Sequence, residues 1–174
     1  MATWQFDGLI VPRNIFSEKF RVLPNEIDME EFGSVDWWSR TNISKSFIRD
    51  VIPLAMVGNG EIIPGVETWG QENGNRIDVL YSKENRVVEI SVRIDARDVS
   101  EEFIIELMIF LNKLDCLMIC ENGLVLDPHR NVGSALLSML NQINKSNAKK
   151  FVDSPEDFFK QIDEDTRTES DEEG

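Results

Sequence analysis

Two segments of alternating hydrophobicity between Arg76 and Arg97 constrain the fold of this chain more than any other feature. Apolar residues recur in the first at Ile77, Val79 and Tyr81, and in the second at Val88, Ile90, Val92 and Ile94. A period of two residues is typical of a β-strand with one buried face. The intervening residues 82–85 have the composition of a turn. The sequence therefore predicts a central β-hairpin.

The register expected for this hairpin follows from its four-residue loop. With Tyr81 opposite Arg86, the apolar positions of both strands share one face, and Asp78 is opposite Glu89 on the other. The second face then gathers the charged and polar side chains of the hairpin, which are Arg76, Asp78, Glu89, Ser91, Arg93, Asp95 and Arg97.

The flanking segments have the spacing of further strands and helices. Strands are expected at 4–11, ending at Pro12, at 116–120 and at 124–126, the last two joined by a tight turn; helices are expected twice within 15–32, at 44–52, from a cap at Asp98 or Ser100 to Leu114, at 132–143 and at 154–162. Gly58-Asn59-Gly60 and Gly70 to Gly74 are interpreted as turns. This order predicts an α+β fold with a mostly antiparallel sheet, a central hairpin and helices packed on one face.

Charge divides the chain into two parts. Of the net charge of −14, residues 153–174 carry −8 and residues 1–152 carry −6. From Asp163 onward no apolar residue remains to compensate the entropy lost on ordering. We therefore expect a single α+β domain over residues 1–162 and a disordered acidic tail over residues 163–174.

The negative charge also limits the choice of partner. It disfavours binding to nucleic acid, where basic groups must neutralise phosphates, and favours a basic protein partner. Cys116 and Cys120 lie about 13 Å apart in an expected strand, too far for a disulfide. No export signal or membrane-spanning segment is apparent, so a reduced, cytoplasmic protein is expected.

The polar face of the hairpin is open to three interpretations. It is a solvated surface with cross-strand ion pairs, a recognition face, or a site where Asp78 and Glu89 share a proton or a cation. Trp37 and Trp38 are further candidates for binding, because adjacent residues in regular structure cannot both point into one core. His129, the only histidine, is expected in an ordinary exposed position. No metal site, cofactor or catalytic residue is predicted.

Several stretches resemble a family of small, acidic, uncharacterised bacterial α+β proteins. They are Phe6-Asp7-Gly8-Leu9-Ile10-Val11-Pro12, Val35-Asp36-Trp37-Trp38, Trp69-Gly70 with Gly74-Asn75-Arg76-Ile77-Asp78-Val79, and Val92-Arg93-Ile94-Asp95-Ala96-Arg97. The resemblance covers about residues 4–160 and implies neither catalytic residues nor a cofactor. Some small acidic bacterial proteins are immunity proteins encoded beside toxins, so the analogy implies an immunity-type role.

Two hypotheses for function follow. The leading one is a non-enzymatic protein-binding module, in the form of an immunity-type inhibitor of a basic toxin, with contacts through Trp37, Trp38 and the polar face of the hairpin. The alternative is a small enzyme, or a metal- or small-molecule-binding protein, that uses the carboxylates of Asp78, Glu89 and Asp95. The oligomeric state is left open by the sequence.

Overall fold

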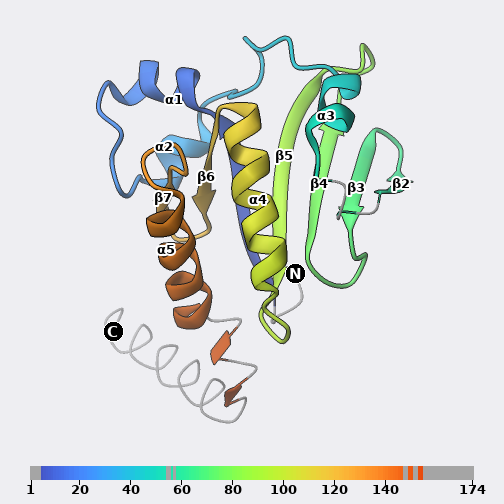
Figure 1. Ribbon diagram of the computed structural model, residues 1–174. Helices are drawn as coiled ribbons and strands as arrows, with labels where there is room; N and C mark the ends of the chain where they lie inside the picture. The colour runs from blue at the N-terminus through green and yellow to red at the C-terminus, as the bar shows by residue number, and fades with distance from the viewer. Residues whose placement is uncertain (1–4, 54–55, 57, 147–148, 151–152, 155–174) are drawn as a thin grey trace, which may run out of the picture.

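The computed structural model describes residues 5–53, 56, 58–146, 149–150 and 153–154. Within these residues the chain forms one seven-stranded sheet, of order β2-β3-β4-β5-β1-β6-β7, and five helices (Figure 1). The strands are β1 Gln5–Pro12, β2 Gly58–Ile63, β3 Val66–Gly70, β4 Arg76–Tyr81, β5 Val87–Asp95, β6 Cys116–Cys120 and β7 Val125–Leu126; the helices are α1 Arg13–Phe20, α2 Met29–Gly33, α3 Lys45–Val51, α4 Glu101–Leu114 and α5 Val132–Lys145. All strand pairs are antiparallel, which confirms the predicted α+β fold.

Capping residues explain where the helices of the covered face begin. The Ser44 hydroxyl accepts a hydrogen bond from the backbone amide of Phe47, and the Ser100 hydroxyl does the same for Phe103. Of the two caps expected for α4, Ser100 is therefore the one used. Helix α4 ends where Asp115 adopts a left-handed conformation with φ 53°. Such caps satisfy backbone groups that the helix itself leaves unpaired.

The central hairpin forms as β4 and β5, but its predicted register is wrong by two residues. Asp78 is opposite Ser91, and Leu80 is opposite Glu89. The loop is tighter than expected, because Ser82 pairs with Arg86 and Asn85 adopts a left-handed conformation with φ 58°. A β-bulge between Leu80 and Tyr81 shifts the register by one further residue relative to the prediction. Because side chains alternate between the two faces, a register shift of two residues leaves the same residues on each face. The exception is at the start of β5, where Val87 rather than Val88 is buried.

One face of the sheet, which we call the covered face, lies beneath α3, α4 and α5 (Figure 1). Its residues alternate along each strand and are almost completely buried; they include Phe6, Ile10, Ile77, Val79, Ile90, Val92, Ile94, Met118 and Cys120. Both cysteines are free thiols within this core. Their pKa values are raised by burial, to about 12 for Cys120. They are packing residues with unreactive thiols.

The opposite face is covered in one part and open in another. Around Val11 it is covered by the segment that holds α1 and α2, through Phe32 and Trp37, and Leu9 lies at the edge of this cover. Beyond this segment, the same face of β1, β3, β4 and β5 has no helix over it among the described residues. We call this exposed part the open face.

Gly58-Asn59-Gly60, predicted as a turn, instead begins the edge strand β2. Its pairing with β3 is irregular between Gly58 and Gly60, which fits the tolerance of glycine for bulges. The helix expected at 154–162 and the tail at 163–174 lie outside the described residues. No helix in the described part of the chain has both the length and the apolarity needed to cross a membrane.

Candidate functional site

The open face brings together side chains from four neighbouring strands. They are Asp7 and Leu9 of β1, Thr68 of β3, Arg76, Asp78 and Leu80 of β4, and Glu89, Ser91 and Arg93 of β5. Because residues two apart on a strand point to the same side, one alternating pattern places all of them together. The polar face predicted for the hairpin is therefore the centre of a wider surface.

This surface is hollowed by two adjoining depressions, which we call together the open-face hollow. The β1 half, about 320 Å³, is lined by Asp7, Gly8, Leu9, Met29, Asp78, Ser91, Val92, Arg93, Ile119, Cys120 and Glu121. The β3 half, about 390 Å³, is lined by Ile63, Val66, Thr68, Glu72, Arg76, Asp78, Leu80, Glu89 and Ser91. Asp78 and Ser91 line both halves, so the two depressions adjoin at these residues of β4 and β5.

Both arginines in the hollow are held by carboxylates. Arg93 Nε lies 3.2 Å from an Asp7 oxygen, and Arg76 Nε lies 2.8 Å from an Asp78 oxygen. The second oxygen of Asp78 accepts a hydrogen bond of 2.6 Å from the Thr68 hydroxyl. Each of the four ion-paired side chains is at most about a quarter exposed. These pairs fix the floor of the hollow and cancel its positive charge.

Other carboxylates in the hollow remain uncompensated. The side chains of Glu72 and Glu89 have no hydrogen-bond or ion-pair partner among the described residues. At the far end of the β1 half, burial and then the charge of Asp7 raise the pKa of Glu121. The rim of the hollow is thus more acidic than its floor.

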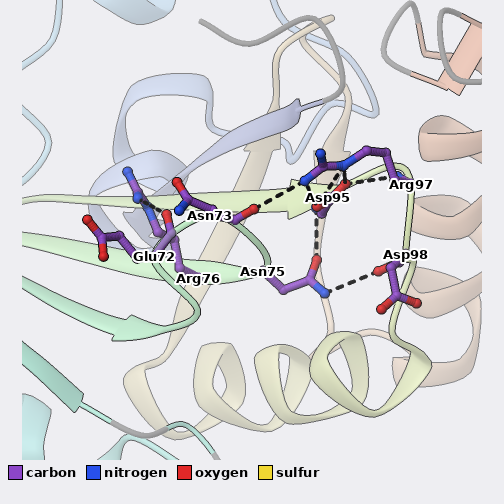
Figure 2. A network of polar contacts seen from close by, with 7 residues as sticks. All are labelled: Glu72, Asn73, Asn75, Arg76, Asp95, Arg97 and Asp98. Atoms are coloured by element: carbon purple, nitrogen blue, oxygen red, sulfur yellow. Dashed lines mark hydrogen bonds and ion pairs between the residues drawn. The ribbon is translucent and has the colours of Figure 1, made fainter.

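A polar network closes the end of the hairpin beside the hollow (Figure 2). The Asp95 carboxylate accepts hydrogen bonds from Arg97 Nε and Nη2, the shortest at 2.6 Å, and from the Arg97 backbone amide. Hydrogen bonding from Arg97 holds the pKa of Asp95 below its usual range. Asn75 joins this pair to the loop that precedes α4. The network contains Asp95 and Arg97 but leaves both outside the lining of the hollow.

The prediction that one of the two adjacent tryptophans is exposed is wrong. Trp37 and Trp38 are 7% and 4% exposed. They lie in an irregular segment after α2, where neighbouring side chains need not alternate. Trp37 stacks between Phe16 and Phe32, and its indole N–H donates to the Phe32 carbonyl. Trp38 donates to the Ile10 carbonyl at 3.2 Å. Both are core residues, so neither side chain is available at the surface for contact with a partner.

The pairing of Asp78 with Glu89, on which the acid–base and metal interpretations depend, does not form. Asp78 is opposite Ser91, and its two oxygens are bound by Arg76 and Thr68. No group of three or more potential metal-ligating side chains is present among the residues that the structure describes. His129, expected to be exposed, is half-buried, with its Nε2 3.5 Å from an Asp115 oxygen.

Of the predicted site residues, Arg76, Asp78, Glu89 and Arg93 meet in the hollow. The sequence interpretation missed Asp7, Leu9, Thr68, Leu80 and Glu121. The sequence could have predicted part of this result, because Asp7 and Leu9 alternate with the residues of the first strand that face the core. Their place beside β5 depends on β1 pairing with a strand some 80 residues later, which local periodicity does not reveal.

No protein-family model matches the chain, and no curated protein or solved structure is similar enough to it to indicate a relationship. The resemblance noted for the sequence is left untested by these comparisons.

Proposed function

We propose that the chain is a non-enzymatic protein-binding module and that the open face is its interface. The observation that carries this proposal is the open-face hollow, a concave surface left uncovered on an otherwise packed sheet. Aliphatic side chains stand exposed within or beside it, with Ile63 60% and Leu80 36% exposed. Exposed apolar groups next to satisfied polar groups are typical of a surface that a partner covers.

The charge of the chain supports a basic partner. A net charge of −14 accelerates encounter with a positively charged protein, and the acidic rim of the hollow extends this complementarity to the interface. A basic toxin is the partner that the resemblance to small acidic bacterial proteins suggests. The proposal accordingly includes an immunity-type inhibitor that acts in the cytoplasm, where its two free thiols remain reduced.

A small ligand is the second candidate, and the size of the hollow favours it. Each half has a volume within the range of ordinary small-molecule sites. Catalysis or cation binding by Asp78 and Asp95 receives less support, since Arg76 and Arg97 occupy their oxygens. A metal ion would have to displace these guanidinium groups.

The test is capture of a partner from the native host by three forms of the full chain. They are the wild type, Leu80→Arg in the hollow, and Leu137→Arg on α5, where the exposed Leu137 side chain provides a matched control on the other side of the sheet. Bound proteins are identified by mass spectrometry at low and high salt. We expect one basic protein, released by salt, with the wild type and Leu137→Arg but not with Leu80→Arg. Equal capture by all three forms, or no capture, contradicts the proposal; no capture favours a small ligand.

A further inference from the structure

We propose that the β3 half of the open-face hollow binds an extended basic segment of the partner, with one lysine or arginine near Glu89 and another near Glu72. This inference rests on the proposed function and specifies the chemistry of the interface. The occupant is thus a polypeptide, and its recognition elements are two cations on one side of an extended chain.

Charge complementarity is the first argument. The lining of the whole hollow contains the five carboxylates of Asp7, Glu72, Asp78, Glu89 and Glu121 and the two guanidinium groups of Arg76 and Arg93, a net charge of −3. A concave wall with low dielectric behind it concentrates the field of such charges. The site therefore favours cationic over anionic or neutral segments.

The second argument is that some charged side chains of the hollow are already paired within the chain, whereas others are free to pair with a partner. Arg76 donates to the backbone oxygen of Glu72 (Figure 2). Its guanidinium group is also held by the Asp78 carboxylate. Because Thr68 also donates to Asp78, this carboxylate has little capacity left for a partner. Glu72 and Glu89 lie on the exposed rim without side-chain partners among the described residues. They are the acceptors that a partner's cations meet.

The third argument is spacing. Glu89 is opposite Leu80 of β4, and the backbone oxygen of Glu72 accepts a hydrogen bond from the side chain of Arg76, which lies four residues before Leu80 on the same strand. Four residues of strand span about 13 Å. An extended segment laid along β4 repeats its side chains at the same interval, so basic residues at positions i and i+4 match the two glutamates. A helix would bring the same two positions to within about 6 Å.

The apolar lining suits such side chains as well. Ile63, Val66 and Leu80 lie in the same half of the hollow as Glu89. Lysine and arginine have long aliphatic stems that pack on apolar surface while the charged end stays near water and carboxylates. Apolar contact and ion pairing are therefore available to one side chain at once.

The experiment uses two short blocked peptides of identical composition as probes. The matching peptide is Lys-Thr-Val-Thr-Lys, and the mismatched one is Lys-Lys-Thr-Val-Thr. Each is titrated into the isotope-labelled full chain at physiological ionic strength, and binding is followed by amide chemical shifts. We expect the matching peptide to bind more tightly and to shift the amides of Leu80, Glu89 and Ser91.

Variants then locate the binding. The double variant Glu72→Gln/Glu89→Gln is expected to weaken binding of the matching peptide by about fivefold, from the loss of two exposed ion pairs. The control Asp50→Asn/Glu84→Gln makes the same change of net charge at exposed positions outside the hollow. It is expected to leave affinity within about twofold.

The inference is overturned by equal effects of the two double variants, by equal binding of the two peptides, by shifts confined to residues outside the hollow, or by no binding. These results differ from failure of the proposed function. If Leu80→Arg abolishes partner capture while the peptides do not distinguish the variants, the interface stands and the basic segment is wrong. If Leu80→Arg captures the partner normally, the interface itself is wrong.

Discussion

The side-chain oxygen of Asn75 accepts a hydrogen bond of 2.9 Å from the backbone amide of Asp95. Its amide nitrogen donates to the backbone oxygen of Asp98 at 3.3 Å. One buried side chain therefore connects the turn before β4, the end of β5 and the loop that leads to α4 (Figure 2). This connection holds the end of the hairpin from which Arg76 enters the open-face hollow.

Asn75→Ala is accordingly expected to lower the free energy of unfolding by about 1–3 kcal/mol, because it leaves a buried backbone amide without its partner. The measurement is equilibrium unfolding in urea. Asn73→Ala is the matched control, since Arg97 donates to the backbone oxygen of Asn73, which the substitution keeps, and the Asn73 side chain is exposed. Equal losses from the two variants would contradict the role assigned to Asn75.

The Asp95–Arg97 pair predicts a dependence of stability on pH. Hydrogen bonding from Arg97 lowers the pKa of Asp95 in the folded protein, so the folded state binds this proton more weakly than the unfolded chain. The resulting stabilisation is complete above the ordinary pKa of an aspartate, about 4, and is lost as the pH falls through the folded value.

Asp95→Asn removes this dependence. The difference in unfolding free energy between wild type and variant is therefore expected to be larger at about pH 7 than at about pH 3. Urea unfolding at several pH values measures it, with Asp50→Asn on the exposed side of α3 as the control. A difference that stays constant with pH would show that Asp95 gains nothing from its ionised form.

The two adjacent tryptophans make different contributions to the core. Trp37→Ala removes a ring stacked among three phenylalanines and is expected to cost about 3–5 kcal/mol. Trp38→Phe keeps most of the packing but loses the hydrogen bond to the Ile10 carbonyl. This loss is expected to lower the free energy of unfolding by about 1 kcal/mol. Trp69→Phe is the control, because the buried Trp69 indole N–H has no hydrogen-bond partner within the described residues.

Chemical unfolding monitored by circular dichroism checks these values without depending on indole fluorescence. The expected order of destabilisation is Trp37→Ala, then Trp38→Phe, then Trp69→Phe. A negligible effect of Trp37→Ala would mean that Trp37 is the exposed member of the pair, a choice that the sequence alone had left open.

The sequence predicted the hairpin and the composition of its two faces because side-chain alternation depends only on local geometry. It did not predict the register, because one left-handed residue, Asn85, and one bulge shift the strands without exchanging their faces. The tryptophans were misjudged since alternation rules apply only to regular structure. The hollow could not be predicted from the sequence, because it forms only when β1 inserts between β5 and β6, a long-range pairing that local patterns do not reveal.

Glu67 is a buried polar residue on the covered face, where its carboxylate contacts α3 and Tyr81. The residue is 4% exposed, and its carboxylate lies beneath α3, 2.5 Å from an Arg49 nitrogen and 3.7 Å from Lys45 Nζ. The Tyr81 hydroxyl donates to its other oxygen at 3.2 Å. Burial first, and then the charge and hydrogen bond of Glu67, raise the pKa of Tyr81 far above its usual value.

Glu67→Gln is therefore expected to lower the pKa of Tyr81, although burial still keeps that pKa above the ordinary value of about 10. Tyr81 is the only tyrosine in the chain, so the tyrosinate absorbance band that appears during an alkaline titration comes from this residue alone. In the wild type, ionisation of Tyr81 should coincide with alkaline unfolding, whereas in Glu67→Gln it should begin at lower pH. The control Glu84→Gln, on the exposed hairpin turn, should titrate like the wild type. Ionisation of wild-type Tyr81 near pH 10, before any unfolding, would show that the ring is accessible and that Glu67 does not face it.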